Sequence, residues 1–336
     1  MTKSKVVSAV EAVARIPDGA VIAVCGVGAG GIATQSIEAL ADRFDEEQHP
    51  KNISVIHAGG NPTPGLLTME GCMGAYYSGL PSIDTAIIRE NRFPVYSFSQ
   101  GIILHLIRAQ ANDTPYLSRA GINTFVDPRI EGGAENALAA ENPVVEVVTI
   151  GGEEFLHFKL PPITVAIIRG TTADTEGNIT FEDETVKHEA LYLAMAAHNH
   201  GGIVIAQVKY VAEAGGLRGA EVKVPGILVD YVVPYSAAEH SSKPEFNTDK
   251  RGRQRRPMMD HLSMPYGPGL TGYFRVDEGI IPFERTKPDG DRLIIVRRAS
   301  EELQPGNVCN IGIGIPVGVA YITSTERIHE MYTLSN

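Results

Sequence analysis

Apolar residues in the first part of the chain follow two alternating patterns. Residues 20–25 are apolar at every position, which is typical of a strand buried on both faces, and a second strand is expected at residues 53–57. Between them, apolar residues recur every three or four positions, as Ile37, Leu40 and Phe44 do, and this spacing predicts helices. Buried strands that alternate with helices predict an open α/β sheet in which most strands are parallel.

The same patterns predict the remaining elements of this part. Further strands are expected at residues 85–88, 144–150, 164–168, 203–208 and 227–233. Helices are expected at residues 6–13, 101–111 and 186–199, and from Thr34 onward, where the Thr34 side chain is expected to cap the helix.

One segment of the pattern occurs twice. Residues 5–31 and 292–318 each contain a helix-like stretch, a turn with proline and glycine, a short apolar strand with a cysteine near its end, and a glycine-rich loop. Such a repeat predicts two related open α/β domains. Few residues follow the second copy before Asn336, so the second domain is expected to be incomplete in this chain.

Composition changes sharply between the two copies. Residues 241–275 are rich in proline, glycine and polar side chains, which favours a linker between a first domain at residues 1–240 and a second at 276–336. A basic cluster lies within this linker: Lys250, Arg251, Arg253, Arg255 and Arg256. It is either a solvated part of the linker or a phosphate-binding patch.

Charge and composition exclude several classes of protein. The 336 residues are 43% apolar and 21% charged, as in soluble globular proteins. A net charge of -11 argues against a nucleic-acid partner. Residues 19–37 are uncharged, but their glycines and polar residues favour a strand, a loop and a helix over a membrane span. With no signal peptide in the pattern, we expect a cytoplasmic protein.

The cysteines and histidines do not predict a metal site. The three cysteines, Cys25, Cys72 and Cys309, form no CxxC pair, so they are expected to be small buried apolar residues. The ten histidines include no HExxH pattern.

The first glycine loop, residues 26–31, is the leading candidate for chemistry. Its G-x-G-x-x-G pattern permits a dinucleotide site, but that site also needs an acidic residue at the end of the next strand, which ends instead at His57. Alternatively, backbone N–H groups at Gly26, Val27 and Gly28 stabilise an oxyanion, or the glycines serve only tight packing. The second loop, at Gly312, Ile313 and Gly314, offers similar donors, and the two loops are expected to enclose one cleft.

Several motifs resemble those of the family I coenzyme A transferases, in particular the single-chain acetate/propionate group with a fused α-like and β-like half. In chain order they are Asp18-Gly19 with the glycine loop, Ser99-Gln100-Gly101, residues 123–129 (NTFVDPR), 168–174 (IRGTTAD), 177–180 (GNIT), 223–230 (KVPGILVD) and 310–316 (NIGIGIP). The resemblance implies two open α/β domains of the CoA-transferase (NagB/RpiA-like) type.

The resemblance also implies an activity. Enzymes of this family transfer CoA between a short-chain acyl-CoA and a free carboxylic acid, by ping-pong catalysis through a glutamyl-CoA thioester. CoA is then a substrate and no metal is needed. The loop at Gly26, Val27 and Gly28, with the Gln100 amide, is expected to form the oxyanion and substrate site. Gly312, Ile313 and Gly314 are expected to bind CoA or the acyl group.

The resemblance places the glutamate nucleophile immediately after Asn336. Three explanations are open: a partner or continuing polypeptide supplies it, the chain is truncated, or the protein lacks transferase chemistry. We favour a partner chain that completes the second domain, within a homo- or hetero-oligomer, because half a domain would expose its sheet edge. The alternatives in function are a CoA-thioester hydrolase or lyase and a non-catalytic acyl-CoA-binding subunit.

Overall fold

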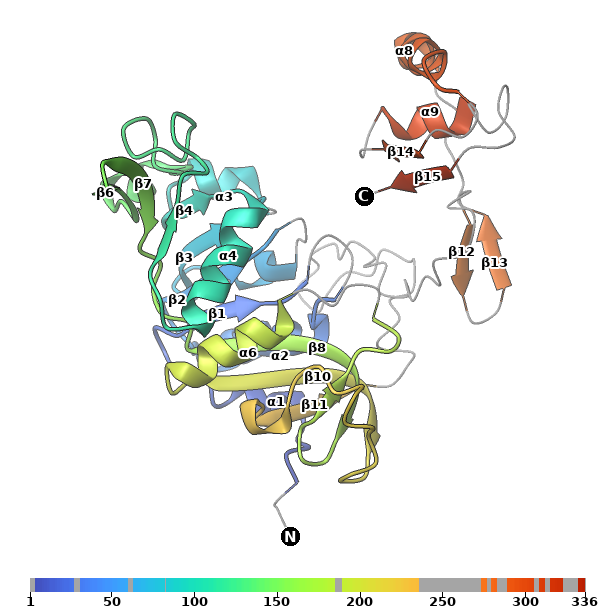
Figure 1. Ribbon diagram of the computed structural model, residues 1–336. Coiled ribbons are helices and arrows are strands. Elements are labelled where there is room, and N and C mark those ends of the chain that lie inside the picture. The colour runs from blue at the N-terminus through green and yellow to red at the C-terminus, as the bar shows by residue number, and fades with distance from the viewer. Residues whose placement is uncertain are drawn as a thin grey trace. The chain divides into compact units, whose positions relative to one another are not determined.

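The structure is a computed structural model with two compact units, Met1–Asp260 and His261–Asn336 (Figure 1). The described residues are 4–26, 31–59, 63–81, 83–184, 189–235, 273–276, 279–282, 289–304, 308–311, 315–322 and 332–335. The predicted basic cluster at residues 250–256 lies outside them, as does most of the predicted linker, so the linker bounds stay a prediction.

The first unit is built on an open, mostly parallel sheet with the strand order β11-β10-β8-β1-β2-β3-β4. All neighbours along this order pair in parallel, and the short β9 pairs antiparallel with β8. The strands are β1 (Val21–Val24), β2 (Ile53–His57), β3 (Met73–Ser78), β4 (Val95–Ser97), β8 (Val165–Asp174), β9 (Ile179–Thr180), β10 (Ile203–Ala212) and β11 (Tyr231–Pro234). The predicted sheet is therefore confirmed.

Helices cover both faces of this sheet, which explains why β1 is apolar and buried at every position. The longer helices are α2 (Thr34–Glu47), α4 (Gln100–Ala111) and α6 (Ala190–Asn199), and α1 (Ala9–Val13) is short. Helices α4 and α6 pack together on one face and α1 and α2 on the other (Figure 1). Along β1, Val21 and Ala23 join the first of these cores and Ile22 and Val24 the second.

One predicted element differs from the structure in type, and another differs in its cap. Residues 85–88 were expected to be a strand but lie in helix α3 (Thr85–Arg89), because the Asp84 side chain caps it by accepting the N–H of Ala86 at 2.9 Å. The helix predicted from Thr34 begins there, but Thr34 does not cap it. The cap residue is Ala33, whose side chain makes no hydrogen bond to the helix. Strands β3 and β4 were not predicted at all.

The strand predicted at residues 144–150 exists outside the main sheet. It is β6 (Val145–Ile150), which pairs antiparallel with β7 (Glu153–Phe158), itself paired with β5 (Tyr116–Ser118). Gly151 and Gly152 join β6 to β7 with φ values of 61° and 86°, the positive values that a two-residue hairpin turn favours. The strand predicted at residues 227–233 is shorter in the structure. Its first residues belong to the short 3₁₀ helix η2 (Gly226–Leu228), and the strand itself is β11.

The remaining helical segments of the first unit are short: η1 (Thr63–Leu67) and α5 (Ala137–Glu141). The second unit contains β12 (Tyr273–Val276), β13 (Gly279–Pro282), α8 (Gly290–Ser300), β14 (Val308–Ile311), α9 (Val317–Ile322) and β15 (Tyr332–Ser335). Strands β14 and β15 pair in parallel around α9, as β1 and β2 do around α2. The two copies of the sequence repeat therefore each hold a helix and a strand, α1 and β1 in the first and α8 and β14 in the second, and each is followed by a helix and a parallel strand.

Candidate active site

The site candidate lies where the strand order reverses. From β1 the chain adds β2, β3 and β4 on one side, and later β8, β10 and β11 on the other. In open α/β sheets, ligands bind at the carboxyl ends of the strands at this point. Here that edge carries Cys25 and Gly26 after β1, His57 at the end of β2, and Arg169 in β8, two residues beyond Ile167, the last β8 residue paired with β1.

The first glycine loop is tied down at its start by two buried side chains. The N–H of Gly26 donates to Oε1 of Glu189 at 3.2 Å, and Nε2 of His57 lies 3.1 Å from the carbonyl oxygen of Gly26. Because a carbonyl can only accept, Nε2 of His57 carries the hydrogen. Gly26 has a φ of 97°, a conformation that favours glycine. Both polar groups of Gly26 are thus held by side chains.

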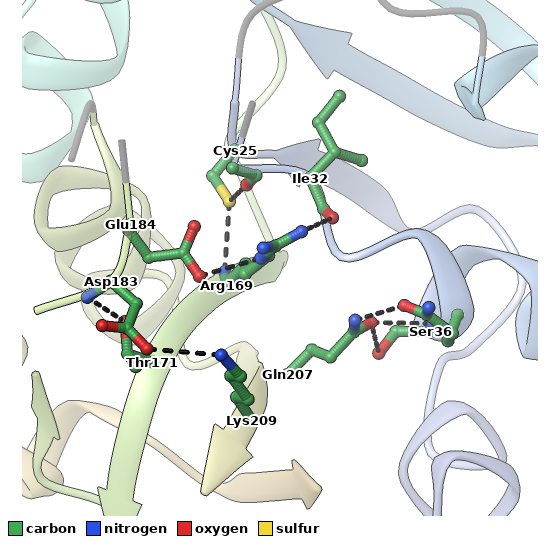
Figure 2. Close-up of polar contacts among 11 residues, drawn as sticks. Cys25, Ile32, Ser36, Arg169, Thr171, Asp183, Glu184, Gln207 and Lys209 are labelled. Atoms are coloured by element: carbon green, nitrogen blue, oxygen red, sulfur yellow. Dashed lines mark hydrogen bonds and ion pairs between the residues drawn. The ribbon is translucent and has the colours of Figure 1, made fainter. Parts of the chain in front are cut away.

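The far end of the loop is held from β1 and β8. The thiol of Cys25 donates to the carbonyl of Gly31 at 2.8 Å, and the N–H of Arg169 donates to the Cys25 sulfur at 3.2 Å. The guanidinium of Arg169 reaches the carbonyl of Ile32 at 3.5 Å, as Figure 2 shows. Its Nε also lies 2.9 Å from Oε1 of Glu184, in an ion pair whose side chains are 5% and 4% exposed.

Burial controls the charges in this site. It raises the pKa of Glu189 to about 7, although the N–H bond from Gly26 opposes the shift. Burial also raises the pKa of the Cys25 thiol, and the Glu189 carboxylate adds to that effect. Cys25 is therefore a neutral hydrogen-bond donor and not a nucleophile. Cys72 is buried as well, as predicted for both residues.

The Gln207 side chain caps the start of helix α2. Oε1 of Gln207, in β10, accepts the N–H of Ser36 at 3.1 Å and the Ser36 hydroxyl at 3.2 Å (Figure 2). The amide of Gln207 also donates to the Gln35 side chain. A dinucleotide site uses the N–H groups at this helix end for phosphate, so the Gln207 contact argues against that interpretation. No acidic residue follows β2 at His57, Ala58 and Gly59.

Gln100 lies at the same edge of the sheet, exposed at the first position of α4. The Ser99 hydroxyl caps this helix by accepting the N–H of Ile102 at 3.2 Å. A Cβ atom placed on Gly79 would lie 2.1 Å from the carbonyl oxygen of Ala58 and 2.8 Å from Cγ of Gln100. Glycine at position 79 therefore permits the ends of β2 and β3 to approach the start of α4.

The other predicted site residues lie outside the described residues: Val27, Gly28, Gly312, Ile313 and Gly314. Their roles, and a cleft between the two loops, stay predictions. Within the described ranges no three His, Cys, Asp or Glu side chains form a group able to hold a metal. None of the helices described here is long and apolar enough to cross a membrane.

Sequence reasoning missed the side chains that hold the loop. Glu189 is separated from Gly26 by 163 positions, and no spacing in the sequence connects them. For His57, the sequence indicated only that it stands where a dinucleotide site needs an acidic residue. Arg169 belongs to the motif at residues 168–174, so the sequence did contain a signal for this residue.

Comparison with known proteins shows the family of this chain. A sequence model described as Coenzyme A transferase matches residues 6–234. The chain belongs to the coenzyme A transferase family. It is 36% identical over 341 residues to caffeate CoA-transferase of Acetobacterium woodii, covering 99% of this chain and 61% of that protein. It is 33% identical over 341 residues to acetate CoA-transferase YdiF of Escherichia coli K12, covering 98% and 60%.

Solved structures agree with this assignment. A crystal structure of the acyl-CoA transferase YdiF of E. coli O157:H7, a thioester complex with CoA, matches with a TM-score of 0.76 and 31% identity. The match covers 99% of this chain and 61% of that one, so the chain spans about three fifths of the length of these relatives.

Proposed function

We propose that this protein transfers CoA between a short-chain acyl-CoA and a free carboxylic acid. The observation that carries the proposal is the first glycine loop, whose Gly26 and Gly31 backbone groups are bound by buried side chains where the strand order reverses. A loop anchored at both ends suits oxyanion stabilisation, because N–H groups that are already in place need no reorganisation during the reaction. The names of the relatives, caffeate and acetate CoA-transferases, support acyl-CoA and carboxylic acid substrates.

The proposed reaction proceeds through the enzyme's own carboxylate. A glutamate oxygen attacks the thioester carbonyl, forming a mixed anhydride and releasing CoA thiolate. The thiolate then attacks the glutamyl carbonyl, which releases the first acid and leaves a glutamyl-CoA thioester. The second carboxylate repeats these steps in reverse and leaves as its CoA thioester. Oxyanions are stabilised by N–H groups of the first glycine loop and by the Gln100 amide.

The glutamate is proposed to follow Asn336 in a continuing or partner polypeptide. The greater length of the relatives supports this placement, since they extend beyond the part that aligns with this chain. Gly312, Ile313 and Gly314 would then bind CoA or the acyl group from the second domain. We place the complete enzyme in the cytoplasm as an oligomer, in short-chain fatty acid, ketone body or propionate metabolism.

The test uses the complete assembly, including any partner chain. It is incubated with an acyl-CoA and then treated with borohydride, which reduces a glutamyl thioester to an alcohol that mass spectrometry locates. We expect one modified glutamate and ping-pong kinetics with a second acid. Thioester hydrolysis without transfer would favour a hydrolase, and binding of acyl-CoA without any turnover would favour a non-catalytic binding protein.

A further inference from the structure

The strongest unassigned feature of the site is the double contact on Gly26. Glu189 precedes helix α6 and binds the N–H of Gly26, while His57 ends β2 and binds its carbonyl. The Glu189 and His57 side chains belong to residues that are 3% and 0% exposed. Two elements distant in sequence therefore hold one glycine from both sides.

Holding the carbonyl of Gly26 also controls the next amide group. A peptide group is planar and almost always trans, so the carbonyl of one residue and the N–H of the next belong to one plane and point in opposite directions. The next N–H is that of Val27, one of the proposed oxyanion donors. A donor turned away from the oxyanion contributes nothing, so the orientation of this peptide group matters for the rate.

The Gly26 N–H itself is already in use. It donates to a buried carboxyl group, and exchanging that partner for a substrate oxygen would leave a buried acceptor without its bond, which costs free energy. Gly26 is therefore better suited to anchor the loop than to donate to an oxyanion.

We propose that Glu189 and His57 are positioning residues that orient the peptide group after Gly26, so that the glycine loop presents its N–H groups to the reacting carbonyl. This inference rests on the proposed CoA transfer. Glu189 and His57 touch neither substrate nor reacting atoms in this scheme. The effect proposed for them passes through Gly26.

The test compares variants of similar size in the complete enzyme. Glu189→Gln keeps an oxygen acceptor for the Gly26 N–H, whereas Glu189→Leu removes it. His57→Gln keeps a donor for the carbonyl, whereas His57→Leu removes it. Glu153→Gln, at an exposed position at the start of β7, is the matched control. Each variant is measured for kcat, for KM of the acyl-CoA, and for amide hydrogen exchange without substrates.

We expect the leucine variants to lower kcat by about 10–100-fold with little change in KM, since a misplaced group affects the transition state most. The glutamine variants should keep a clearly larger share of kcat. Exchange should accelerate in peptides covering residues 25–33 of the leucine variants and stay unchanged in peptides covering 203–212. A structural defect without positioning would instead accelerate both regions and affect the glutamine and leucine variants alike, which would overturn the inference.

Hydrogen exchange separates this inference from the proposed function. If the wild-type enzyme transfers no CoA, the proposed function fails, but exchange at residues 25–33 still shows whether Glu189 and His57 hold the loop. Unchanged exchange in both leucine variants would overturn the inference even in an active enzyme. Should Glu189→Leu not fold, Glu189→Asp replaces it, because it keeps the carboxyl group but shortens the reach to Gly26. Wild-type exchange and kcat in Glu189→Asp would then overturn the inference.

Discussion

Arg169 and Glu184 form an ion pair inside the site, with Nε and Oε1 2.9 Å apart and side chains that are 5% and 4% exposed. The pair lies beside the first glycine loop, because Arg169 also binds Cys25 and Ile32. Removing one partner of a buried pair leaves a buried charge without compensation. We expect Glu184→Ala to lower the free energy of unfolding by about 3–5 kcal/mol, measured by urea denaturation.

An exposed ion pair provides the control for this prediction. Arg119 and Glu153 lie 3.1 Å apart, with both side chains 60% exposed. Water screens such pairs, so Glu153→Ala should cost less than about 1 kcal/mol. Equal losses in Glu184→Ala and Glu153→Ala would mean that burial does not set the strength of the Arg169 pair.

Gly79 is expected to tolerate no side chain. A Cβ atom there would lie 2.1 Å from the backbone oxygen of Ala58, which cannot move aside as a flexible side chain could. Gly79→Ala should therefore lower the free energy of unfolding by about 3 kcal/mol, measured by thermal unfolding. Gly101→Ala is the matched control, since its Cβ would meet only the Ser99 hydroxyl, at 3.9 Å. In helix α4 it should be neutral or stabilising by up to about 1 kcal/mol, and the reverse order of the two variants would refute the prediction.

Gln207 is expected to stabilise the start of helix α2. Gln207→Ala leaves the buried N–H and hydroxyl of Ser36 without the oxygen that now accepts both, so we expect a loss of about 2–3 kcal/mol in chemical denaturation. Ser36→Ala removes only the hydroxyl and should cost about 1 kcal/mol. If Gln207→Ala costs no more than Ser36→Ala, the N–H contact contributes little.

Glu189 should make stability depend on pH. Burial raises its pKa from 4.5 to about 7, so the folded protein binds this proton more tightly than the unfolded chain. Its contribution is fully present below pH 4.5 and is lost as the pH rises through 7. Across this window the difference in unfolding free energy between wild type and Glu189→Gln should change by about 3 kcal/mol, measured by urea denaturation at several pH values. A constant difference would show that Glu189 does not titrate there.

Local patterns predicted most of the main sheet but missed its two strands β3 and β4 on one side. Strand β1 and the first halves of β8 and β10 are buried on both faces, so most of their positions are apolar and the signal is strong. Strands β3 and β4 were not predicted, because tyrosines, serines and a glycine interrupt their apolar residues. The segment at Thr85 was assigned the wrong type because a run of Thr, Ala and Ile is compatible with either state, and the Asp84 cap decided it.

The sequence by itself determined the class of fold, the glycine loop and the family, because apolar periodicity and short motifs are written in neighbouring residues. Only the tertiary structure decided what holds that loop. His57 and Gly26 meet because the carboxyl ends of the parallel strands β2 and β1 lie at one edge of the sheet, and Glu189 reaches the same edge at the start of α6. Hydrogen bonds between groups this far apart along the chain depend on how the strands and helices are arranged in space, which no local pattern records.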